Sequence, residues 1–319
     1  MPERARDILS TVIAKYTIEV VVVGFVIVLL ITSSDFGTHE NIMGVLRQSA
    51  FVGIGAAGMT LLIVSGAFDL SVASLLALCA IAAGQLVGDV GVILAVLGAL
   101  VLGGLLGTLN GLIVTRLKVP AFVATLGMQY VYLAVAYIWT NAQVVVITNT
   151  AFLALGAGNV IGLPTPFVIM IGTYAVCWYL FRRTRYGRQV RALGSNERAG
   201  LIAGVAVNRV KIATFALVGV CTALAGVLLA ALVSSADGMI ATGYELNVIA
   251  AVVVGGTSLN GGRGTLVGSF TGAIFFTLVS NALDLYGVGS YWQYVATGLV
   301  LVSALAVEGL RRRFRLVPA

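Results

Sequence analysis

Few side chains in this sequence could perform acid–base, nucleophilic or metal chemistry. His39 is the only histidine, so neither a Ser-His-Asp triad nor a histidine-rich metal site can be built. Cys79, Cys177 and Cys221 lie far apart within apolar runs, without a metal-ligand pattern nearby, which favours packing roles. The sequence has no Gly-Lys-Ser/Thr phosphate-binding motif, so we expect the chain to bind no cofactor and not to be an enzyme.

Composition indicates a protein dissolved in lipid. Hydrophobic residues make up 60% of the 319 residues and charged residues 10%, against roughly 45–50% and about 25% in soluble chains. The mean hydropathy is +1.06. A soluble fold could not cover such a chain with polar groups. This excludes a soluble enzyme, a nucleic-acid-binding domain and a disordered protein.

The apolar residues form runs of the length that spanning helices need, roughly 20 residues. Polar or glycine-rich breaks separate them, for example at 32–35, 88–89 and 260–264. The interval 66–71 is so short that it predicts a tight turn or a broken helix. We therefore predict an all-α integral membrane protein, one transmembrane domain over 1–319, with about ten spans near 13–31, 42–64, 70–88, 91–114, 121–139, 166–181, 211–233, 246–260, 264–281 and 290–308.

Basic residues are distributed unevenly between the predicted loops. If the N-terminus is cytoplasmic, every Lys and Arg except Arg47 falls in or beside a cytoplasmic segment. Cytoplasmic loops of membrane proteins carry such an excess of positive charge. Both termini are therefore predicted to be cytoplasmic. Six of the twelve acidic residues fall on the outer side instead: Asp35, Glu40, Asp89, Asp237, Glu245 and Asp284.

Glycine spacing predicts close packing of the spans. The chain has 39 glycines, and small residues four positions apart let two helix backbones approach closely in lipid. Several glycines have this spacing, among them Gly84 and Gly88, then Gly103, Gly107 and Gly111, and also Gly268 and Gly272.

Asp69 is the acidic residue most relevant to the interior. An ionised group inside a bilayer costs several kcal/mol, so it is either functional or well satisfied. Its place before the 70–88 run suggests that it caps that helix, and a direct role in transport is the alternative. The spans contain no acidic relay and no mid-span ion pair, so a proton- or sodium-coupled carrier has no visible machinery.

The segment 182–211 is the one large cytoplasmic feature, and it is strongly basic. Within it, Asn196–Ala203 predicts a short helix with Asn196 as its cap and Glu197 near its positive end. Such a helix could rest on anionic lipid or dock on a cytoplasmic partner. Composition alone does not decide between the two.

The same segment resembles the cytoplasmic loop of ribose-type ABC importer permeases. That family has the pattern Thr-x-Phe/Tyr-Gly-Arg, then Ala-x-Gly-Gly-Asn-Glu-x-Ala, then Gly-Ile/Val. Three further blocks resemble the family in the same order over about 200 residues. The matching positions are Thr184–Arg188, Ala192–Ala199 and Gly204–Val207 in the loop, then Ser65–Val72, Asn110–Gly111 with Val119–Gly127, and Val254–Thr265.

The resemblance implies a membrane-spanning importer subunit for a monosaccharide or related polyol in a bacterial inner membrane. The implied partners are a cytoplasmic ATPase that binds ATP and magnesium, a periplasmic or extracellular sugar-binding protein, a second permease copy or paralogue and the lipid bilayer, with no nucleic acid. A short coupling helix would transmit ATPase closure to the bundle. By match, that element is formed by Asn196, Glu197, Arg198, Ala199, Gly200 and Gly204.

The sequence departs from the family pattern in two places. Ala67 and Phe68 replace Gly-Ile, which could reshape the lumen, and Ser195 replaces a glycine of the coupling loop. Polar and aromatic residues at span ends could contact a sugar, although Tyr and Trp there also serve as interface anchors. The candidates for the substrate pathway are Asp69, Gln129, Tyr130, Asn281, Tyr291, Trp292 and Gln293.

Two other functions remain open at this stage. A branched-chain amino acid permease of the ABC type would share the fold plan. A secondary carrier driven by an ion gradient would be a different class, and independence from ATP would distinguish it.

Overall fold

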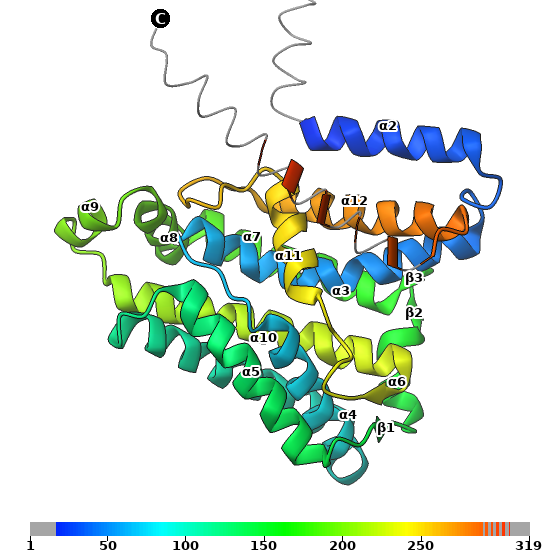
Figure 1. Cartoon of the computed structure of the whole chain (residues 1–319), viewed down its shortest axis with the longest axis horizontal. Helices are drawn as coiled ribbons and strands as arrows, with labels where there is room; N and C mark the ends of the chain where they lie inside the picture. Colours follow the sequence, from blue (N-terminus) through cyan, green and yellow to red (C-terminus); the bar gives the residue numbers. More distant parts are fainter. Residues whose placement is uncertain are drawn as a thin grey trace, which may run out of the picture.

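The computed structural model describes residues 17–289 and the positions 291, 292, 295, 298, 299, 302, 303 and 306. This part of the chain is predominantly helical (Figure 1). The helices are α2 (Thr17–Thr32), α3 (His39–Val64), α4 (Val72–Arg116), α5 (Ala121–Thr140), α6 (Thr150–Ala157), α7 (Thr165–Arg183), α8 (Arg185–Ser195), α9 (Glu197–Ile202), α10 (Val207–Val233), α11 (Tyr244–Val254) and α12 (Leu266–Leu285). More than half of the predicted tenth span lies outside the described residues.

Four two-residue strands form two small antiparallel pairs in this part of the chain. β1 (Val145–Val146) pairs with β4 (Ser235–Ala236), and β2 (Asn159–Val160) pairs with β3 (Leu163–Pro164). Together with α6, they lie in the connections that follow α5 and α10. These connections lie between the predicted spans, and no structure is predicted for them from the sequence.

α4 is a helical hairpin rather than one long helix. Gly91 interrupts it with backbone angles of φ 79° and ψ 169°. A straight helix would separate Ser71 from Asn110 by about 60 Å, yet Asn110 Nδ2 donates to Ser71 Oγ over 2.8 Å. The two arms match the predicted spans 70–88 and 91–114. The predicted break at 88–89 is helical, because the chain reverses at the glycine whose missing Cβ allows a positive φ.

Six described helices are long and apolar enough to cross a membrane: α3, α4, α5, α7, α10 and α12. α2 and α11 are shorter apolar helices. The chain is therefore a multi-span helical membrane protein. The boundary of α11 differs most from the prediction: it ends at Val254 instead of 260, because Gly255 and Gly256 (φ 84°) turn the chain there.

α3 is the centre of the bundle. Every residue from Gly53 to Val64 is buried, and α7, α10, α11 and α12 pack around it. The second arm of α4 packs along α10, where a Cβ on Gly103 or Gly107 would collide with the carbonyl oxygen of Gly219 or Phe215. The prediction of close packing is confirmed for these glycines.

The connections gather at two ends of the bundle. At one end, Gly262 N donates to Val64 O over 2.9 Å, joining the turns that follow α3 and α11. The opposite end holds the β1–β4 pair and two reciprocal amide hydrogen bonds between Asn41 and Asn281. Figure 1 shows α9 at the first end and β2 and β3 at the other. We call the first end, with segments 65–71, 117–120, 184–206 and 255–265, the basic end.

Candidate functional site

Two short helices, α8 and α9, connect α7 to α10 at the basic end. Thr184 Oγ1 accepts the Gly187 N–H and begins α8. Asn196 Oδ1 accepts the Ala199 N–H over 3.0 Å and begins α9. The predicted short helix with Asn196 as its cap is confirmed. α8 was not predicted from the sequence.

α8 is fixed to the end of α7 by the Arg191 side chain. Its Nη1 donates to Phe181 O over 2.6 Å, and its guanidinium lies 4.7 Å from the centre of the Phe181 ring. Burial and the charges of two neighbouring arginines lower the pKa of Arg191 from its very high usual value. The apolar face of α8 is buried as well, through Gly187, Val190 and Leu193.

The C-terminal end of α8 meets the bundle at Gly194. A Cβ there would collide with Val64 O and Gly262 N, so α8, the end of α3 and the turn after α11 touch backbone to backbone. The next residue, Ser195, is exposed and its Oγ donates to Arg191 O over 3.0 Å. The departure from glycine at 195 is therefore accommodated, because this hydroxyl is exposed and hydrogen-bonded within α8 where it lies beside Gly262.

α9 presents apolar side chains outward. Leu201 is 64% exposed and Ile202 88% exposed, whereas Gly200 is buried against Leu193. Gly204, with φ 78°, turns the chain toward α10. Arg198 and Ala199 are exposed, and Glu197 forms an ion pair with Lys211 of α10, Oε2 to Nζ 2.7 Å. The residues that the resemblance assigns to the coupling element therefore form one compact feature at the surface of the basic end, with Gly200 buried beneath it.

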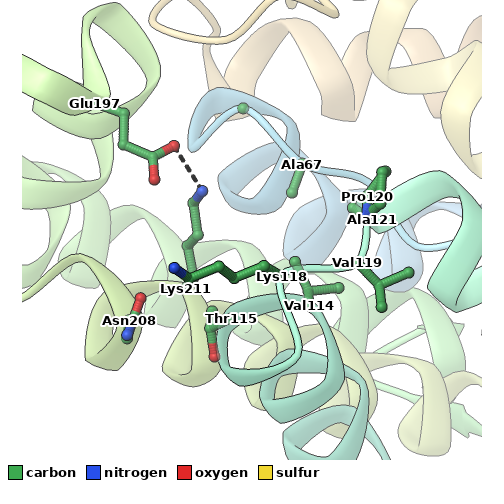
Figure 2. A pocket seen from close by; sticks show the side chains of 11 residues that line it. Ala67, Val114, Thr115, Lys118, Val119, Pro120, Ala121, Glu197, Asn208 and Lys211 are labelled. Carbon is green, nitrogen blue, oxygen red and sulfur yellow. Dashed lines mark hydrogen bonds and ion pairs between the residues drawn. The ribbon is translucent and has the colours of Figure 1, made fainter.

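A cavity of about 410 Å³ lies between α9 and the spans (Figure 2). Glu197, Asn208 and Lys211 form one wall. The turn at Gly66 and Ala67 and the α4–α5 turn at residues 118–121 form the other. In Figure 2 the Lys211 side chain reaches up to the Glu197 carboxylate beside this space.

Asp69 is fully buried in a hydrogen-bond network near the basic end. Its Oδ1 accepts the N–H and the hydroxyl of Ser71 over 2.8 and 2.6 Å. Its Oδ2 accepts Asn110 Nδ2 over 2.9 Å, and Asn110 Oδ1 accepts the Tyr132 hydroxyl over 2.8 Å. Ser71 is the cap of α4, so the predicted cap at Asp69 is corrected. The carboxylate joins the two arms of α4 instead, because it accepts from groups on both.

The other pathway candidates do not form one site with Asp69. Gln129, on α5, lies beside the carboxylate of Glu245 in the first turn of α11. Tyr130 is 69% exposed, and Asn281 is paired with Asn41 at the opposite end. Tyr291 and Trp292 are exposed, and Gln293 lies outside the described residues.

Among the residues that the structure describes, no cluster of three His, Cys, Asp or Glu side chains could hold a metal ion. The three cysteines are buried and free.

Comparison with known proteins gives the family. Residues 41–305 match the family described as "Branched-chain amino acid transport system / permease component". The chain belongs to this permease family. The permease is 41% identical over 288 residues to the ribose import permease protein RbsC of Escherichia coli strain K12, covering 88% of this chain and 89% of that one. It is 39% identical to RbsC of Bacillus subtilis strain 168 over 89% of both chains.

A third relative covers nearly all of the permease. It is 35% identical to the L-arabinose ABC transporter permease protein AraH of Azospirillum brasilense, over 98% of this chain and 93% of that one. No solved structure matches the chain.

Sequence reasoning missed two features of the permease that the structure supplies. α8 has a signal that could have revealed it, since Thr184 precedes apolar residues at Tyr186, Val190 and Leu193, the spacing of one helix face. The Glu197–Lys211 ion pair has no such signal in the sequence, because the two residues are 14 positions apart and belong to different helices.

Proposed function

We propose that this permease is the membrane-spanning subunit of an ATP-driven importer for a monosaccharide, and that α9 is the element that receives force from a cytoplasmic ATPase. The observation that supports this most is the exposure of Leu201 and Ile202 on a capped helix. Two exposed aliphatic side chains are unfavourable on a surface that faces water, whereas a groove in a partner protein would cover them.

The relatives support a sugar as the cargo. Those described above are named for ribose and L-arabinose. We therefore favour a pentose or similar monosaccharide over a branched-chain amino acid, although the family description names the latter. The chain itself would bind neither ATP nor magnesium, which would be held by the ATPase.

The charge distribution supports a cytoplasmic basic end. We propose about ten spans with both termini on that side, in a bacterial inner membrane. The opposite end would then receive a soluble sugar-binding protein, and the pathway would lie between this chain and a second permease.

Capture of partners from native membranes tests the proposal. The permease with a C-terminal tag is solubilised in mild detergent, and co-purifying proteins and Mg-ATPase activity are measured. We expect an ABC ATPase to be captured by the wild type and lost from Ile202→Asp, because a charged side chain cannot enter an apolar groove.

Ile161→Asp is the matched control. Ile161 is 96% exposed at the opposite end, so this variant should capture the ATPase like the wild type. Undiminished capture by Ile202→Asp would exclude α9 as the docking element. A wild-type permease that purifies alone, without ATPase activity, in several detergents would favour a gradient-driven carrier.

A further inference from the structure

α9 is attached to the spans by few contacts of its own. It packs against α8 and the start of α10, and Gly200 is its one buried residue. The neighbouring α8 is fixed to α3 through Gly194. A displacement of α9 can therefore reach α3 through α8. It can reach α10 through the link 203–206, through α8, whose Tyr186 hydroxyl hydrogen-bonds Thr214 Oγ1 over 2.7 Å, and through direct contacts between α9 and α10.

The Glu197–Lys211 ion pair is the polar contact between these two helices. Lys211 Nζ lies 2.7 Å from Glu197 Oε2, and it is the one salt bridge among the residues that the structure describes. The Lys211 side chain is 16% exposed and that of Glu197 55% exposed. The pair is thus shielded on the lysine side, where the stem of Lys211 lines the cavity wall with Val114 and Ala121.

α10 is tightly joined to α4 from the residue that follows Lys211. A Cβ on Gly111 would collide with the backbone of Ile212, one residue beyond Lys211. The same is true one turn farther at Gly107 with Phe215, and again at Gly103 with Gly219. Backbones in such contact cannot slide or separate without losing their packing. A force applied at Lys211 therefore moves α10 and the second arm of α4 together.

The cavity makes the ion pair important for this route. Its space lies between Glu197 and the turns at residues 66–67 and 118–121 (Figure 2), so this side of α9 does not rest on those turns. The Lys211 side chain bridges the distance from α10 to Glu197. Without the pair, α9 would act on α10 only through the link 203–206, through α8 and through apolar contacts, so it could tilt into or away from the cavity with less movement of α10.

We infer that Glu197 and Lys211 are positioning residues that connect α9 to α10, so that displacement of α9 moves the unit formed by α10 and the second arm of α4. This inference rests on the proposed function, in which a partner ATPase displaces α9. Neither side chain needs to contact sugar or nucleotide for this role. The pair acts by fixing the distance between two helices.

Charge reversal tests the inference in the complete importer. Permease variants Glu197→Lys, Lys211→Glu, the double reversal and Lys211→Arg are co-reconstituted with the captured ATPase and the sugar-binding protein. Sugar uptake is measured with labelled ribose and arabinose, ATP hydrolysis is measured in parallel, and the readout is sugar carried per ATP hydrolysed. Arg209→Glu is the matched control, since Arg209 is exposed on the same helix and makes no ion pair in the described region.

We expect each single reversal to lower the ratio of sugar to ATP by about fivefold or more, the scale of a typical coupling between sites. The double reversal should recover most of the wild-type ratio, because it restores a pair of opposite charges. Lys211→Arg should retain most of that ratio, because it keeps such a pair. Arg209→Glu should leave the ratio unchanged. Equal ATPase capture by all variants separates this effect from loss of docking.

Two results would overturn the inference. In one, the single reversals keep the wild-type ratio, so the pair transmits nothing. In the other, the double reversal is no better than the singles, so each charge acts separately. If the wild type neither captures an ATPase nor carries either sugar, the proposed function fails, and the role of the pair fails with it.

Discussion

At the scale of residues, the interior of this permease uses hydrogen bonds where ion pairs would be costly. Asp69 is buried without a basic partner, and three donors from Ser71 and Asn110 satisfy it. Buried acceptors that lose a donor cost more than the bond contributed when formed. The arrangement also has a direction, because Asn110 must present its amide nitrogen to Asp69 and its oxygen to Tyr132.

Exchanging the two side chains tests this direction. Asp69→Asn places an amide N–H against a donor of Asn110 or Ser71, so we expect a loss of about 1–3 kcal/mol of stability. Asn110→Asp should also destabilise, since it brings two carboxylates together. The double variant Asp69→Asn with Asn110→Asp can satisfy all the groups again and should recover much of the melting temperature in detergent. A double variant less stable than both singles would contradict this network.

At the scale of elements, glycine decides which helices touch. Gly103 and Gly107 are in backbone contact with α10, whereas a Cβ on Gly88 would meet nothing within 4 Å. All three belong to the same spacing pattern in the sequence. The pattern is therefore necessary for close packing but does not identify the face that is used.

Alanine substitutions measure the difference. We expect Gly107→Ala to lower the melting temperature in detergent, because the new methyl would push α4 away from Phe215 at a cost of about 1–3 kcal/mol. Gly88→Ala is the control and should be neutral or slightly stabilising, since alanine favours the helix. Equal melting temperatures for the two variants would show that α4 and α10 are not packed as described.

At the scale of the whole molecule, the connections alternate between two ends. The basic end holds the turns after α3 and α11 together with α8 and α9, and the opposite end holds the two strand pairs. Positive charge is concentrated at the first, which predicts its place in the cytoplasm. The ATPase and the sugar-binding protein would then act on opposite ends of one bundle.

Accessible cysteines test this orientation. The two variants are Ser34→Cys and Ser195→Cys. Ser34 lies in the connection between α2 and α3, Ser195 is the last residue of α8, and both serines are exposed. The native cysteines are buried, so they should give little background. With an impermeant thiol reagent, we expect Ser34→Cys to react in intact spheroplasts and Ser195→Cys to react only after permeabilisation. The reverse pattern would invert the proposed topology.

The membrane class, most span positions, the short helix at α9 and the family could be predicted without coordinates. This was possible because hydropathy, capping and local motifs depend on neighbouring residues, as Asn196 shows by capping the helix it precedes. The packing of the bundle was needed to show that Gly91 rather than Gly88 reverses α4, that Asp69 joins both arms of that hairpin, and that Lys211 reaches Glu197. These contacts depend on which helix faces which across the bundle, and in lipid small residues permit many such pairings without selecting one.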